Sequence, residues 1–152
     1  MKATELRIGN KVLNDNVENT VVAIASANLN IVGLETMQGN LINAGIDRIK
    51  PIPLTEEWLL EFGCGKKEIN DYYKETDDFG ILFYHEINFN GGWFTLGINS
   101  DNEYYLCDSG YDLDDKDSMA SFACGLPSIK YVHQLQNLFF ALTGEELEIK
   151  TN

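Results

Sequence analysis

Residues 6–54 alternate between short apolar runs and turn-forming residues. The segments TVVAIAS and NIVGLET are rich in β-branched side chains, and the turn-forming ANLN separates them. LRIGNKVL alternates in the same way, with Gly9-Asn10 as a bulge or turn, and MQGNLINAG adds a weaker strand. Pro51 and Pro53 end the pattern, because proline cannot donate a ladder hydrogen bond. This pattern predicts a small antiparallel β-barrel or curved sheet, and the number and length of the strands favour an SH3-like one.

A compact helix is predicted next, over PLTEEWLLEFGCG. Thr55 can cap its first turn, and Gly63 can stop it in the left-handed conformation. The polar segment KKEINDYYKETDDFG predicts a loop or an edge segment. After it, ILFYHEINF, GWFTLGI and EYYLCD predict an antiparallel β-meander, since turn-forming residues separate the three runs. MASFACGL predicts one further short strand.

The last predicted helix begins near Ser128, as its N-cap, and ends at Gly144. An apolar stripe at helical spacing predicts that this helix covers a sheet. His133 falls on the opposite, solvent side, where it could form a small contact patch with Phe140, although single exposed aromatic side chains are common. The stripe comprises Tyr131, Val132, Leu135, Leu138, Phe139 and Leu142.

These elements predict an α+β fold. We expect a small β-barrel-like subdomain over 1–54, and an α+β subdomain over 55–152 in which the meander packs on the closing helix. A chain of 152 residues can bury a core without a disulfide or a metal, so we expect the two parts to form one compact unit.

The charge of the chain limits the classes of partner that it is expected to bind. The formal net charge of −13 disfavours nucleic acid and anionic lipid, because both are themselves negative. Such acidity serves solubility, and it also suits a cationic protein partner. No apolar run approaches the length of a membrane span, and the start MKATELRIGN has no apolar signal core, so we expect a cytoplasmic protein.

The cysteines and histidines do not have the spacing of a metal site. Three cysteines, an odd number, are spread over positions 64, 107 and 124, which argues against a disulfide framework. We therefore expect no metal and no cofactor. Cys64 precedes Lys66 and Lys67, which could lower the pKa of its thiol, but the sequence places no base beside it.

The meander carries two candidate features on opposite faces. Tyr84, Trp93 and Tyr105 share one face if the register allows, and such an aromatic platform can bind a sugar, a base or a peptide. The alternative is that another element covers this face. His85 lies on the other face among apolar residues, where a buried core histidine is expected more often than a catalytic or metal-binding one.

An acidic loop, DSGYDLDDKD, spans Asp108 to Asp117. An EF-hand needs glycine at its sixth position and glutamate at its twelfth, but Leu113 and Met119 stand there when counting from Asp108. A solvated loop is the simpler interpretation, and weak binding of a divalent cation stays open.

Three strings carry a resemblance: LRIGN near the N-terminus, PIPLTEEWL in the middle and YVHQLQNLFFALTGEEL near the C-terminus. With them the chain resembles a group of small uncharacterised proteins from gut-dwelling bacteria and their prophages. The resemblance implies a cytoplasmic bacterial or phage origin and one continuous unit, and it brings no activity.

The sequence favours a soluble, non-enzymatic binding or protein-interaction protein that serves a mobile genetic element. Its candidate contact residues are Tyr84, Trp93, Tyr105, His133 and Phe140. One alternative is a small hydrolase that uses carboxylates with His85 or His133. A second is an acidic inhibitor that mimics nucleic acid and occupies a basic protein.

Overall fold

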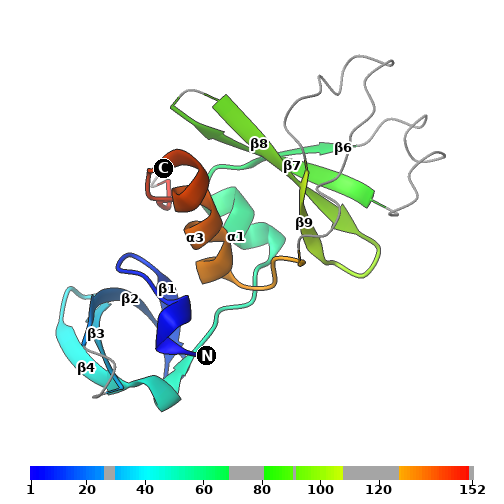
Figure 1. The fold of residues 1–152 in the computed structure, drawn as a ribbon. Helices are drawn as coiled ribbons and strands as arrows, with labels where there is room; N and C mark the ends of the chain where they lie inside the picture. The colour runs from blue at the N-terminus through cyan, green and yellow to red at the C-terminus, as the bar shows by residue number, and fades with distance from the viewer. Residues whose placement is uncertain (26–29, 69–80, 91, 108–126, 151–152) are drawn as a thin grey trace. The chain divides into compact units, whose positions relative to one another are not determined.

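The computed structural model describes residues 1–25, 30–68, 81–90, 92–107 and 127–150 (Figure 1). Its contacts divide the chain into two compact units, Met1–Leu54 with Tyr131–Leu147 and Thr55–Lys130 with Glu148–Asn152. Each unit holds one antiparallel sheet, and the mixture of sheets and helices is that of the predicted α+β class. Within the described residues, no helix has the length and apolarity to cross a membrane.

The first unit is built on a sheet with strand order β4-β3-β2-β1-β5 (Figure 1). Its strands are β1 (Lys11–Asn14), β2 (Val17–Ile24), β3 (Ile31–Thr36), β4 (Leu41–Gly45) and β5 (Ile49–Lys50). Short 3-10 helices, η1 (Ala3–Glu5) and η2 (Ile46–Arg48), precede β1 and β5. Among the described residues, β4 and β5 are the sheet's edges, so these strands form no closed barrel.

A tight hairpin that the sequence analysis missed begins this sheet. Asn14 pairs with Val17 across the turn, and the two central residues, Asp15 and Asn16, have positive φ angles of 51° and 64°. This is the left-handed backbone of the two-residue hairpin turn that asparagine and aspartate tolerate best. The alternating apolar positions then meet on one face, where the core consists of Leu6, Val12, Val21, Val32, Leu34, Ala44 and Ile49.

Helix α3 (Val132–Thr143) belongs to this first unit and packs against β1. Its C-cap Gly144 has a φ of 74°, as the predicted glycine stop requires. Its N-cap is Tyr131 rather than Ser128, so the predicted start lay too early. The grouping also differs from the expected division at residue 54, because residues 131–147 join the N-terminal sheet.

The second unit contains α1 (Glu56–Glu61) and a sheet with strand order β6-β7-β8-β9. Its strands are β6 (Gly65–Glu68), β7 (Ile81–Phe89), β8 (Gly92–Asn99) and β9 (Tyr104–Cys107). The predicted meander is present as β7, β8 and β9, and β6 is an edge strand that overlaps the segment expected to be a loop or an edge segment. Thr55 is the N-cap of α1, and Gly63, with a φ of 75°, follows the helix as predicted.

Two faces of β8 are buried in this second unit. Leu96 and Phe94 lie on the face that also carries Ile87, while Thr95, on the other face, is only 2% exposed. The predicted strand MASFACGL lies outside the described residues.

Candidate functional site

A tight turn between β3 and β4 forms one wall of a pocket in the first unit. The backbone N–H of Thr36 donates to the Asn40 carbonyl at 2.9 Å, and that of Gly39 donates to the Thr36 carbonyl at 2.9 Å. Gly39 has a φ of 78°, which a residue with a Cβ atom adopts only under strain. The turn therefore fixes the backbone of Met37, a residue of the turn that is 77% exposed.

A row of four residues crosses the sheet beside this turn. Lys11 pairs with Thr20, Thr20 with Glu35, and Glu35 with Leu41. Directly paired residues point to the same side of a sheet, so this row combines two charged side chains with an apolar one that is 75% exposed.

The two acidic groups of this region differ in their partners. Glu18 forms an ion pair with the Lys11 ammonium group, with 3.3 Å between Oε1 and Nζ. Glu35 is exposed and has no ion-pair partner among the described residues. Because one Lys–Glu pair is neutral as a whole, the negative charge of the pocket is carried by Glu35.

The pocket itself has a volume of about 290 Å³. Asn19 lies in its lining at 3% exposure, and its Nδ2 donates to the Val17 carbonyl at 2.7 Å. The Oδ1 atom of Asn19 is buried and accepts no hydrogen bond in the described part of the chain. The lining comprises Lys11, Glu18, Asn19, Thr20, Glu35, Thr36, Met37 and Gly39.

No residue of this pocket was predicted from the sequence as a site residue. The row from Lys11 to Leu41 joins four strands, and it becomes visible only once the register of three strand pairs is known. One signal was available in the sequence: TMQGN places an apolar methionine in a turn, where polar residues are usual.

The predicted aromatic group is partly assembled by the register of the second sheet. Tyr84 pairs with Gly97, and Gly97 pairs with Tyr105, so the two tyrosines flank one glycine in a single row. Trp93 pairs with Asn88, which lies four residues further along β7. The side chains of Tyr84 and Trp93 lie outside the part of the chain that the structure describes.

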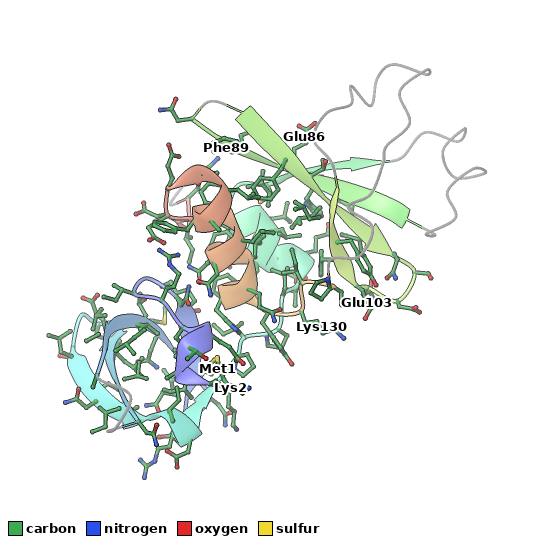
Figure 2. The ribbon with its side chains drawn as sticks, viewed as in Figure 1. Met1, Lys2, Glu86, Phe89, Glu103 and Lys130 are labelled. Atoms are coloured by element: carbon green, nitrogen blue, oxygen red, sulfur yellow. The ribbon has the colours of Figure 1, made fainter. Side chains whose placement is uncertain are left out.

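Tyr105 is half-buried and its polar end is already engaged. Its hydroxyl donates to the Glu103 carboxylate at 2.5 Å, and this hydrogen bond raises the pKa of Tyr105. The same carboxylate lies 3.4 Å from the Lys130 ammonium group, and both side chains are labelled in Figure 2. The hydrogen bond from Tyr105 is also the main reason that the pKa of Glu103 is lowered.

His133 is buried, so its predicted place on the solvent side of the closing helix is wrong. Only 2% of the residue is exposed, and its ring stacks on Tyr131 with 5.8 Å between centroids. Burial lowers the pKa of His133, and the nearby Glu5 carboxylate opposes this effect. The predicted stripe is wrong at its other edge as well, because Leu142 is 53% exposed.

Side-chain amides explain why this side of α3 faces inward. Gln136 Oε1 accepts from the Lys11 N–H at 2.9 Å, and its Nε2 donates to the Gly9 carbonyl at 3.2 Å. Asn137 Oδ1 accepts from Asn10 Nδ2 at 3.0 Å. The backbone of Gly9 and Lys11 thus finds partners on the helix that water would otherwise supply.

Phe140 is 38% exposed and pairs with an arginine. The Arg7 guanidinium lies 3.6 Å from the centroid of the Phe140 ring, and its Nη2 is 2.7 Å from Glu146 Oε1. Phe140 is therefore a partner in a cation–π contact within the first unit. The expected surface patch with His133 does not form, since His133 is buried.

His85 is fully buried, in agreement with its interpretation as a core histidine. Burial lowers the pKa of His85, Glu56 opposes that shift, and Lys66 adds to it. The backbone of Cys64 also opposes it, although neither ring nitrogen makes a hydrogen bond of ordinary geometry within the described residues. Glu56 is bonded to Lys66 at 2.8 Å instead.

Cys64 does not have the lowered pKa that its lysine neighbours suggested. The residue is 3% exposed, and burial raises the pKa of its thiol to about 12. A thiol with this pKa stays protonated at neutral pH and is a poor nucleophile.

The described residues contain no cluster of side chains that could bind a metal ion. Within residues 1–25, 30–68, 81–90, 92–107 and 127–150, no three histidine, cysteine or acidic side chains come together in a way that could hold an ion. The acidic loop from Asp108 to Asp117 lies outside the described residues, and so does Cys124.

No protein-family model, curated protein or solved structure matches this chain.

Proposed function

We propose that this protein is a soluble, non-enzymatic interaction protein that binds a partner protein through the pocket surface of its first unit. The observation that carries the proposal is the pairing of two exposed apolar side chains with an acid-lined pocket. Met37 and Leu41 are 77% and 75% exposed, and Glu35 lies opposite Leu41. Neighbouring apolar side chains that remain in water are typical of a surface that a partner covers.

The topology of the first sheet supports this proposal. A five-stranded antiparallel order β4-β3-β2-β1-β5, with a 3-10 helix between β4 and β5, is the connectivity that an SH3-like unit would have. We propose an SH3-like origin for this unit on that ground. Sheets of this kind often bind extended protein segments across their surface.

The hydrolase alternative has less support from the geometry. A general base must reach its substrate, but His85 is 0% exposed and His133 is 2% exposed. Glu56, the carboxylate whose charge opposes the lowering of the pKa of His85, forms an ion pair with Lys66. The origin in a mobile genetic element and the cytoplasmic location remain proposals that rest on the sequence.

Site-specific photo-crosslinking tests the proposed surface. A photoreactive phenylalanine analogue at Leu41 is expected to capture a partner in host cells, whereas the same analogue at Leu142 is not. Leu142 is a matched control, because it is an exposed leucine of the same unit that does not line the pocket.

Substitution then separates the candidate surfaces. Met37→Ser with Leu41→Ser should abolish co-purification of the captured partner, while Trp93→Ala and Phe140→Ala should retain it. Loss in Trp93→Ala alone would move the interaction to the second sheet. A partner retained by all these variants but released by moderate salt would favour the acidic mimic, and turnover of an ester, phosphate or glycoside without any partner would favour the hydrolase.

A further inference from the structure

We infer that the pocket between β1, β2 and the β3–β4 turn receives one cationic side chain, lysine or arginine, from an extended segment of the partner. This inference rests on the proposed function and names the chemistry that the pocket recognises. Three properties of the pocket support a cationic ligand: its charge, the kind of hydrogen-bonding group it leaves open, and the side chains at its rim.

The charge of the lining favours a cation. Its ionisable residues are Lys11, Glu18 and Glu35, which carry one positive and two negative charges. Lys11 and Glu18 neutralise each other in an ion pair at 3.3 Å, so the Glu35 carboxylate remains for a ligand. The chain's net charge of −13 adds a long-range attraction for a basic segment and would raise its rate of association.

The open charged group of the pocket is an acceptor. The Glu35 carboxylate can only accept when it is ionised, and no ion pair among the described residues engages it. The hydroxyl oxygen of Thr36 is already used, since it accepts the Asn40 N–H at 3.1 Å. Lysine and arginine side chains carry donors and no acceptor, so they complement the Glu35 carboxylate, whereas that carboxylate repels a phosphate or a carboxylate.

The size and rim of the pocket suit a side chain that arrives on a peptide. Its volume of about 290 Å³ is far larger than the ~10–15 Å³ that a single water needs. Met37 and Leu41 stand exposed at and beside the turn that walls it. Their apolar surface can cover the aliphatic stem of the entering side chain and an apolar neighbour on the same segment.

Four short probes test the inference directly. Acetylated and amidated peptides Gly-Leu-X-Leu-Gly carry arginine, lysine, citrulline or norleucine at X, and each is titrated into the ¹⁵N-labelled full chain. The arginine and lysine peptides should shift the amide resonances of Asn19, Thr20, Thr36 and Gly39. Citrulline has the shape of arginine without its charge, and it should bind about tenfold more weakly, as expected for the loss of charge-assisted hydrogen bonds.

A charge-matched pair of variants localises the effect. Glu35→Gln should weaken binding of the arginine peptide about tenfold, because it removes the unpaired carboxylate without changing shape. Glu145→Gln removes the same charge from an exposed residue outside the lining and should leave the affinity unchanged. Both residues are exposed, so neither change is expected to unfold the protein.

The outcomes separate this inference from the proposed function. Equal binding of the arginine and citrulline peptides, shifts confined to other residues, or equal effects of Glu35→Gln and Glu145→Gln would each overturn the cation pocket. So would the absence of binding by all four probes. If crosslinking at Leu41 still captures a partner in any of these cases, the interaction surface stands and only its cationic ligand is wrong.

Discussion

The two histidines of this chain are both buried, but one lies on a strand of the second unit and the other on a helix of the first. His85 on β7 and His133 on α3 are 0% and 2% exposed, and burial lowers the pKa of both. His85 sits in a strand whose alternate residues are apolar, so its burial follows from the period of the strand. His133 has lysine, glutamine and asparagine neighbours that resemble a solvated helix face.

The difference lies in what each element packs against. The strand β7 packs side chain against side chain, as the burial of Ile87 beside His85 illustrates. The Gln136 side of helix α3 packs on backbone, because Gln136 binds the Gly9 carbonyl and the Lys11 N–H directly. A hydrophobic stripe in the sequence predicts contacts between apolar side chains. It does not predict a buried face that includes amide side chains bonded to backbone.

The largest effect should come from the centre of the buried face. Leu135 is 0% exposed, so Leu135→Ala should lower the free energy of unfolding by about 2–5 kcal/mol through lost contacts and a cavity. Leu142→Ala should cost no more than about 0.5 kcal/mol, because that side chain is already half in water. Chemical denaturation of both variants checks this, and equal losses would restore the stripe that the sequence predicted.

A smaller loss is expected from the amide side of the same helix. Gln136→Ala leaves the Lys11 N–H and the Gly9 carbonyl without their partner, which should cost about 1–3 kcal/mol. The same measurement, with Gln136→Glu as a second variant, separates the two bonds, since a carboxylate accepts from Lys11 but cannot donate to Gly9. If Gln136→Ala lowers the free energy of unfolding by less than Leu142→Ala does, water replaces the amide and this side of α3 is accessible to solvent.

Acidification should weaken both histidine environments. Each folded-state pKa is lowered from 6.5, so the unfolded chain binds protons more readily. Stability is therefore complete above pH 6.5 and falls as the pH drops through that value toward the folded-state pKa. Denaturation between roughly pH 5.5 and 7.5 should show this slope.

Two variants assign the slope to its source. His85→Asn and His133→Asn each remove one titrating group, so each should show a shallower pH dependence than the wild type. An unchanged slope in His133→Asn would mean that its imidazole reaches solvent, and the comparison between the two histidines would then fail.

Much of the fold followed from the sequence, and its failures have physical causes. Gly63 and Gly144 were identified as helix ends because each needs a positive φ that glycine alone adopts cheaply. The Asp15-Asn16 turn was missed, although both residues are of the type that a two-residue hairpin selects. The pocket could not be predicted, because Lys11 and Leu41 are joined only by the register of the strands between them.

The smallest effect is expected where α3 meets the N-terminal segment at its exposed end. Arg7 stacks on Phe140 at 3.6 Å and pairs with Glu146 at 2.7 Å, and both acidic and aromatic partners are partly exposed. Arg7→Gln should lower the free energy of unfolding by no more than about 1 kcal/mol, because water screens the ion pair and the cation–π contact is not fully desolvated. The part due to the ion pair should diminish in concentrated salt, while the stacking part persists.

Thermal or chemical denaturation of Arg7→Gln, Glu146→Gln and the double variant measures the coupling between the two side chains. A loss comparable to that of Gln136→Ala would place this end of the helix among its buried contacts, and the contrast between a sealed and a solvated side of α3 would have to be redrawn.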